Sequence, residues 1–301
     1  MMTDLKERVG QWFDVEPVYH LIGSGAAIYF VVALLLVYVA KFAKGRAVSF
    51  ALNEELTQKD NKAVGVSTVG YLLGVMIVIR GVLVSDADAP LEEFLISDVL
   101  MTVVWSLVSV GLLLLSAVVN DKWLLHSFCN RKELIEDRNV GTGAVVASSY
   151  VGTALLIAAA VRGASEASFV VELVDTLVYF VVGQLAFIIT GVLYQRFTGY
   201  DIHAEIERDN VAAGVSFGLT LIAVAVLLSG YLQRNDSLIG FAAWIPLSIV
   251  LLLTARALVD RFLIYKSSIK EEIARDQNWG VALVEGGVAL GVAFILNAAF
   301  A

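Results

Sequence analysis

The chain has 301 residues, of which 58% are hydrophobic and 17% are charged, with a formal net charge of −8 at pH 7. Soluble domains carry about 25% charged residues, so this composition argues against a soluble domain, and the acidic balance argues against nucleic acid as a partner. A single cysteine, Cys129, rules out an internal disulfide. The three histidines are scattered without ligand-type spacing, so we expect no metal site and no cofactor.

Along the chain, apolar stretches recur that are long enough to cross a membrane. A spanning helix needs about 20 mostly apolar residues. The expected spans are 22–43, 63–84, 94–119, 141–162, 169–194, 211–232, 237–259 and 279–300. The first span follows the polar segment 1–19 and lacks a convincing cleavage site, which is typical of a retained helix. We therefore predict an all-α polytopic membrane protein with eight transmembrane helices.

The loops between these spans alternate in character. Those after the odd-numbered spans are long, whereas those after the even-numbered spans are short and poor in Lys and Arg. Counting Lys41 and Arg256 at the helix ends, 16 of the 21 Lys and Arg residues lie on the long-loop side. By the positive-inside rule we expect these loops in the cytoplasm, and both termini and the segment 1–19 outside a bacterial inner membrane.

Four times, a short acidic stretch ends in an Asn directly before an even-numbered span. The Asn residues are spaced by 78, 71 and 68 residues, which indicates internal repetition. We predict four helical hairpins in two tandem four-helix units, 20–163 and 168–301. The repeated positions are Glu55, Asp60, Asn61, Glu133, Asp137, Asn139, Glu205, Asp209, Asn210, Glu272, Asp276 and Asn278.

Two interpretations of these repeated residues are open. Asn is a favoured N-cap, and a nearby Asp suits the positive end of a helix, so the motif accounts for helix starts. Alternatively, the residues form a ring of four carboxylate–amide sites at the cytoplasmic mouth of a bundle. The even-numbered spans also carry small residues four apart, such as Gly70 and Gly74, which favours their packing in the interior while the bulkier odd-numbered spans face lipid.

The repeat resembles a known family. A helix, a Glu-containing cytoplasmic segment and Asp-Asn-x-Ala-x-Gly at the start of a Gly-rich helix are similar to the YjfL-like family of bacterial inner-membrane proteins, a domain family of unknown function. The match is best at 60–65 and 209–214, whereas the second hairpin of each unit inserts one residue between Asp and Asn. The resemblance implies an integral inner-membrane protein, often encoded near membrane-stress or polyamine-related genes, and no established reaction.

Polar groups within the spans are candidates for function, because ionisable residues are costly in the membrane. The candidates are Arg80, Asp98, Arg162, Glu172, Asp175, Gln184 and Glu285. One account pairs Arg80 with Asp98, and Arg162 with Asp175 or Glu172, across the short outer loops. The other account makes Asp98, Glu172, Asp175 and Gln184 part of a cation or proton path, since hard cations favour clustered carboxylate oxygens.

Three functions are compatible with these features. A channel or transporter for a small cation, proton or polyamine is favoured by the internal repeats. A non-catalytic scaffold would bind cytoplasmic membrane-stress partners through the acidic amphipathic loops. An enzyme is not expected, because no nucleophile–base set, phosphate loop or nucleotide motif occurs. The lipid bilayer is the expected partner, and the small-residue faces allow a homo-oligomer without requiring one.

Overall fold

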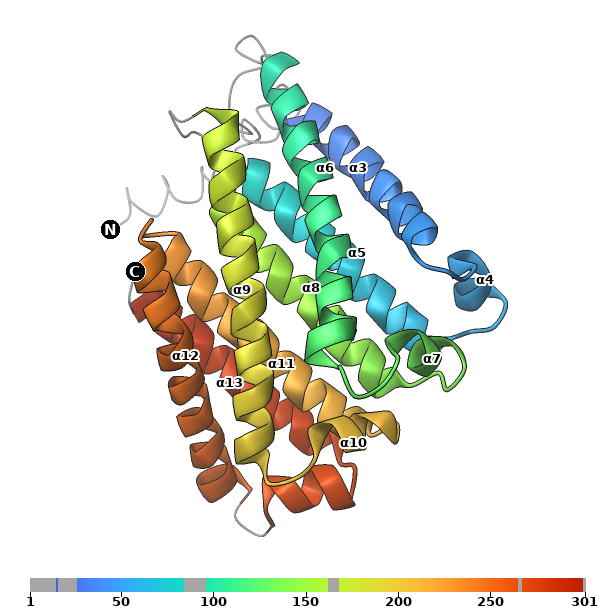
Figure 1. Cartoon of the computed structure of the whole chain (residues 1–301), viewed down its shortest axis with the longest axis vertical. Coiled ribbons are helices and arrows are strands. Elements are labelled where there is room, and N and C mark those ends of the chain that lie inside the picture. Colours follow the sequence, from blue (N-terminus) through green and yellow to red (C-terminus); the bar gives the residue numbers. More distant parts are fainter. Residues whose placement is uncertain (1–14, 16–25, 84–95, 162–167, 265–266, 300–301) are drawn as a thin grey trace, which may run out of the picture.

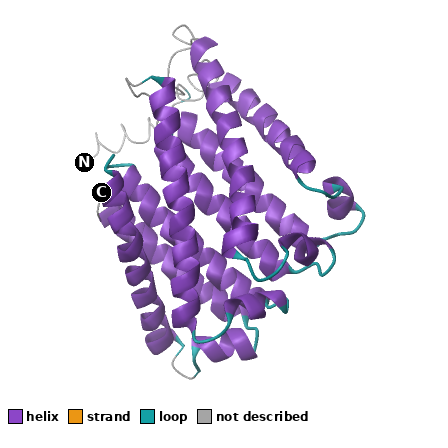
Figure 2. Cartoon of the chain, in the orientation of Figure 1, coloured by secondary structure: helices purple, strands orange, loops and turns teal. Residues whose placement is uncertain are grey.

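The computed structural model describes residues 15, 26–83, 96–161, 168–264 and 267–299. Within them, regular structure is helical throughout (Figure 2). Among the described residues, eight helices are long and apolar enough to cross a membrane, which confirms the predicted class. Apart from residue 15, the expected segment 1–19 lies outside the described residues, and so does Arg162.

The eight long helices form two layers (Figure 1). One layer contains α5 (Lys62–Leu83), α8 (Val140–Ala160), α11 (Val211–Leu232) and α13 (Trp279–Ala299), which contact one another in chain order. The other contains α3 (Ala26–Ala47), α6 (Ile96–Val119), α9 (Phe169–Thr198) and α12 (Leu238–Leu258). The first layer is therefore a row of the four helices that follow the repeated Asn residues.

Small residues allow the helices of this row to approach closely. Gly74 packs against the backbone of α8, where an added Cβ would lie 3.1 Å from the Tyr150 carbonyl oxygen. Gly214 lies directly against Gly141, so α8 and α11 are in backbone contact. Such close approach supplies van der Waals packing where lipid offers no hydrophobic driving force.

The expected division between interior and lipid-facing helices holds only in part. Helices α8 and α11 are the most buried of the eight, but α13 is among the least buried, and half of α6 is buried. The cause is position in the row, because α8 and α11 have neighbours on both sides, whereas α13 has a row neighbour on one side only.

Short helices join the two layers at the long-loop end of the bundle. These are α4 (Leu52–Thr57), α7 (Asn130–Ile135), α10 (Ile202–Glu207) and the π-helical turn η4 (Glu271–Arg275). Two further π-helical turns, η2 (Asn120–Leu124) and η3 (Val259–Leu263), continue α6 and α12 beyond their expected ends.

The residue before each repeated Asn has a left-handed backbone. The φ angles are +48° at Asp60, +52° at Arg138, +59° at Asp209 and +50° at Gln277. Non-glycine residues seldom adopt this region. Its recurrence at four equivalent positions shows that the chain makes the same turn before each repeated Asn. The inserted residues Arg138 and Gln277 take the position that Asp occupies in the other two hairpins.

Candidate functional site: the hairpin junctions

Each repeated Asn caps the helix that follows it. Its Oδ1 accepts a hydrogen bond from the backbone N–H three residues later, at 2.8 Å for Asn139 and 3.2 Å for Asn61, Asn210 and Asn278. This bond satisfies one of the unpaired amides at a helix start. The local conformation at all four positions thus follows from the Asn side chain.

The other end of the Asn amide joins neighbouring repeats. Asn61 Nδ2 donates to Glu55 Oε2 at 3.0 Å and to the Leu134 carbonyl oxygen at 2.9 Å. The later Asn side chains repeat this pattern with Glu133 and Ile206, and with Glu205 and Ile273. The four Glu–Asn pairs therefore form a linear series along the row, in place of the ring proposed as one alternative.

The buried carboxylates of this series differ in their electrostatic environment. Hydrogen bonds from Lys59 and Asn61 hold the pKa of Glu55 below its ordinary value. Burial raises the pKa of Glu133, and the hydrogen bond from Asn139 opposes this only in part. Glu205 is paired with Arg208.

Among the described residues, the carboxylates near the outer end of the bundle do not form a cluster. Asp98 is partly exposed in the first turn of α6 and accepts a hydrogen bond from Ser97 Oγ at 3.3 Å. Glu172 is partly exposed and Asp175 is exposed on α9. Arg80 is exposed, and no ion pair joins it to Asp98 among the described residues.

Two of the candidates are buried between helices. Gln184 of α9 donates from Nε2 to Thr153 Oγ1 of α8 at 3.1 Å. Glu285 of α13 accepts from Ser216 Oγ at 2.6 Å and forms an ion pair with Arg256 of α12. Tyr194 completes this Glu285 cluster, with its hydroxyl 2.5 Å from Ser216 Oγ and 2.8 Å from Arg256 Nη1.

The position equivalent to Tyr194 in the first half of the chain is Lys44. Sequence reasoning missed this residue as a functional candidate. Lys44 lies in the last turn of a spanning helix, where a lysine is ordinarily a topology signal. Its side chain turns inward and is 2% exposed, with Nζ 3.1 Å from the Ser67 carbonyl oxygen and 3.3 Å from Ser67 Oγ. Nζ also lies 5.0 Å from the ring centre of Tyr71 and 4.9 Å from that of Tyr150.

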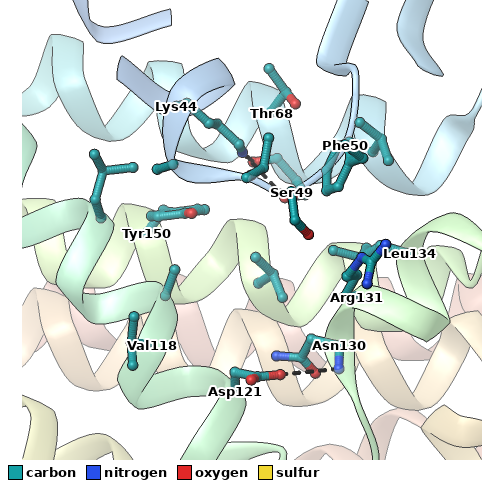
Figure 3. Close-up of a pocket in the computed structure, with 17 residues that line it drawn as sticks. Lys44, Ser49, Phe50, Thr68, Val118, Asp121, Asn130, Arg131, Leu134 and Tyr150 are labelled. Atoms are coloured by element: carbon teal, nitrogen blue, oxygen red, sulfur yellow. Dashed lines mark hydrogen bonds between the residues drawn. The ribbon is translucent and has the colours of Figure 1, made fainter. Parts of the chain in front are cut away.

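A cavity of about 310 Å³ adjoins this ammonium group (Figure 3). Its polar lining includes Lys44, Thr68, Asp121, Asn130 and Arg131, and we call it the Lys44 cavity. Thr68 Oγ1 and Asn130 Oδ1 are buried there without a hydrogen-bond partner among the described residues. Unpaired buried polar atoms are costly, so their presence at a cavity indicates space for a polar guest.

The Lys44 cavity and the Glu285 cluster occupy equivalent places in the two halves of the chain. Lys44 and Tyr194 both lie eleven residues before the repeated Glu, and Ser67 and Ser216 both lie six residues after the repeated Asn. The equivalents of Arg256 and Glu285 are Ala117 and Val146, which line the Lys44 cavity. The small cavity beside Glu285 holds only about 10 Å³, so the ion pair fills the space that the first half leaves open.

The histidines are closer in space than in the sequence. His126 and His203 stack with ring centres 4.9 Å apart, and His203 Nε2 lies 3.0 Å from the Leu124 carbonyl oxygen. In the described part of the chain, no group of three or more His, Cys, Asp and Glu side chains is arranged to hold a metal ion.

These features define an integral membrane protein built from helical hairpins with a common orientation. The chain belongs to the family described as Domain of Unknown Function (DUF350), whose model matches it twice, over residues 18–161 and 168–300. The matches confirm the predicted resemblance to a family of unknown function in two tandem copies. Two of its relatives, however, carry the name UPF0719 transmembrane protein and not the YjfL-like name.

Two curated relatives illustrate the range of the family. A UPF0719 transmembrane protein of Aquifex aeolicus (strain VF5) is 22% identical over 250 residues, which are 81% of this chain and 88% of the relative. The UPF0719 transmembrane protein YshE of Bacillus subtilis (strain 168) is 24% identical over 127 residues, which are 42% of this chain and 93% of the relative. No solved structure matches the chain significantly.

Proposed function

We propose that this protein is a non-enzymatic membrane transport protein that binds a small solute with one anionic group in the Lys44 cavity. The observation that carries this proposal is the buried Lys44 amino group, which has no carboxylate within ion-pair distance in the described part of the chain. A lysine near a helix end ordinarily extends towards water, whereas Lys44 turns into the bundle beside an open cavity.

Two other groups at the cavity suit an anionic guest. Thr68 Oγ1 can donate a hydrogen bond, and Arg131 supplies a second cation from α7. Asp121 also lines the cavity, but its Oδ1 accepts the backbone N–H of Asn130 at 3.1 Å. A volume near 310 Å³ matches the lower end of small-molecule sites.

Internal repetition supports transport over simple binding. Many transporters place their solute site between repeated units, and the Lys44 cavity lies between the first two hairpins. The distribution of Lys and Arg supports an orientation with the long loops in the cytoplasm and both termini outside, in the inner membrane that the family resemblance implies. In that orientation the cavity would be loaded from the cytoplasmic side.

A small cation, proton or polyamine is the competing class of solute. The Lys44 ammonium disfavours cations at this cavity, so a cation path would have to use Asp98, Glu172, Asp175 and Gln184 elsewhere in the bundle. In the described part of the chain, no hydrogen bond or ion pair joins these four residues to one another. The cation path stays a prediction, and flux measurements separate it from the anionic solute.

The scaffold hypothesis rests on a different surface. The apolar residues Leu52 of α4 and Leu134 of α7 are buried against the bundle, so these two helices offer mainly their charged outward faces to a cytoplasmic protein. We therefore rank recruitment of membrane-stress partners second.

The first experiment compares one lysine variant and one arginine variant, each of which removes one positive charge. Binding of acetate, bicarbonate and inorganic phosphate to the purified protein would be measured by calorimetry for wild type, Lys44→Met and Arg46→Met. Arg46 is exposed at the same end of α3 and serves as the matched control. We expect at least one anion to bind, and Lys44→Met alone to weaken it by roughly tenfold or more.

Flux in proteoliposomes then tests transport. The anion that binds would be followed in wild type and Lys44→Met, beside K⁺, Na⁺, H⁺ and spermidine in wild type and an Asp98→Asn, Asp175→Asn double variant. Equal anion affinity in the two single variants would contradict the cavity assignment. Cation flux that the double variant loses would replace the anionic solute with the cation path.

A further inference from the structure

Successive repeats in this chain are joined by one contact used three times. The Asn amide of one repeat donates to the carbonyl of the residue after the repeated Glu in the next, namely Leu134, Ile206 and Ile273. These three acceptor residues are buried. The same donor and acceptor types therefore operate from the first repeat to the fourth.

Helix packing repeats in register with these hydrogen bonds. The ninth residue after each Asn meets the eighth residue after the next Asn. The three pairs are Gly70 with Ala147, Ser148 with Gly218, and Leu219 with Gly286. Each contact leaves no room for an additional Cβ on its glycine. Neighbouring helices of the row therefore pack in the same register at all three contacts.

At the fourth repeat this contact is unused. Asn278 Nδ2 donates to Glu272 Oε2 at 2.8 Å, but it has no donor bond to a following repeat in the described chain. An added Cβ at Gly287 or at Gly291 would meet nothing within 4 Å. The flanking side chains Val284 and Phe294 are 46% and 57% exposed.

At the first repeat the complementary face is unused. Leu56 holds the position of the three buried acceptor residues, yet it is only partly buried, and none of the described side chains donates to its carbonyl. Gly65 faces open space, and Val69, Leu73 and Met76 are 56%, 46% and 47% exposed. Val69 holds the position of Ala147, Gly218 and Gly286.

We propose that a second copy of this chain continues the row head-to-tail, with α13 of one copy packed on α5 of the next. Asn278 would donate to the Leu56 carbonyl of the next copy, and Gly287 would lie against its Val69. The assignment follows from continuity with three interfaces inside the chain, and it does not depend on the proposed solute. Such a contact is heterologous, because two different faces meet.

Two observations favour protein over lipid as the occupant. A glycine face gains contacts when a helix backbone approaches it, which lipid tails supply poorly. In addition, the Bacillus subtilis relative matches over 127 residues that make up 93% of its length, so it is about as long as one half of this chain. If two copies of a half-length chain associated head-to-tail, they would reproduce the α8–α11 contact that joins the two halves here.

Disulfide trapping tests the register of the contact. Val69→Cys and Gly287→Cys would be placed on separate, differently tagged chains in a Cys129→Ser background and reconstituted together. Within one molecule α8 and α11 separate the two positions, so any cross-link is intermolecular (Figure 1). We expect a mixed dimer from this pair, and none when Val69→Cys is replaced by Leu100→Cys, which is exposed on α6.

A second variant tests the assembly without cross-linking. Gly287→Leu should fold as the wild type does, since its Cβ meets open space, but its side chain would block α5 of the next copy. Gly111→Leu is the matched control, because Gly111 on α6 also faces open space. Oligomer mass would be measured in nanodiscs or mild detergent against the 32.4 kDa chain.

We expect wild type and Gly111→Leu to form the same oligomer, and Gly287→Leu to shift to the monomer. A monomeric wild type with no mixed cross-link would mean that lipid covers both faces and would overturn the proposal. A cross-link between two Val69→Cys chains alone would indicate a symmetric dimer through α5 and would overturn it equally.

Discussion

Arg256 and Glu285 form a buried ion pair between α12 and α13, at the place where the first half of the chain carries Ala117 and Val146. The same hairpin junction is thus filled and neutral in one half, and open beside a lone cation in the other. Because the two halves share one packing plan, each serves as an internal control for the other.

Removing one member of the ion pair should be costly. Arg256→Met leaves Glu285 buried without a counter-charge, so we expect a loss of about 3–5 kcal/mol in unfolding free energy. The double variant Arg256→Met, Glu285→Leu should recover most of this loss, because no charge remains buried. Denaturant unfolding in detergent measures the unfolding free energy of both variants. Arg261 is exposed, so the control Arg261→Met should change that free energy little.

A carboxylate placed at the position equivalent to Glu285 should fill the Lys44 cavity. In Val146→Glu the new carboxylate occupies the position of Glu285 and faces Lys44 and Ser67, as Glu285 faces Tyr194 and Ser216. We expect anion binding to fall by roughly tenfold or more, with the fold retained. Calorimetry beside thermal unfolding checks this. Unchanged binding by a folded variant would show that the anion binds elsewhere.

The repeated Asn residues should differ in their cost by position. Asn210→Ala removes an N-cap, the bond to Glu205 and the bond to the Ile273 carbonyl, so we expect about 1–3 kcal/mol of destabilisation. Asn278→Ala removes the cap and the bond to Glu272 only, and we expect about 1 kcal/mol. Unfolding under monomeric conditions compares them. Equal losses would argue against coupling between repeats through the carbonyl.

Glu55 and Glu133 should respond to pH in opposite directions. The lowered pKa of Glu55 means that its contribution to stability is present above the unfolded pKa of about 4.3 and is lost as pH falls through the folded value. The raised pKa of Glu133 means that its contribution is present below about 4.3 and is lost as pH rises through the folded value.

Gln substitutions at these two positions make the difference measurable. Glu55→Gln should destabilise the protein at pH 7, and this deficit should shrink as the pH is lowered. Glu133→Gln should be neutral or stabilising at pH 7, because the amide avoids an ionised group that burial disfavours. Thermal unfolding from about pH 2 to pH 8 provides the test, because the Glu55 contribution is lost below the unfolded pKa of about 4.3. A deficit of equal size for both variants at every pH would contradict the pKa directions.

Local features of the chain were readable without tertiary contacts. Eight spans follow from the length and apolarity of their segments, because a bilayer requires about 20 such residues whatever packs beside them. The helix starts at Asn61, Asn139, Asn210 and Asn278 follow from a side chain that caps a backbone three residues away. Span ends were less predictable, since π-helical turns extend α6 and α12.

The amino-acid sequence by itself determined the membrane class, the number of spans, the repeats and their capping residues, since each depends on hydropathy or on contacts within a few positions of the chain. Only the tertiary structure decided that the repeats form a row and that Lys44 turns into a cavity. It alone paired Arg256 with Glu285 across two helices. The physical reason is that lipid tails are as apolar as the helix surfaces, so helix packing, and not hydrophobicity, selects which polar groups meet.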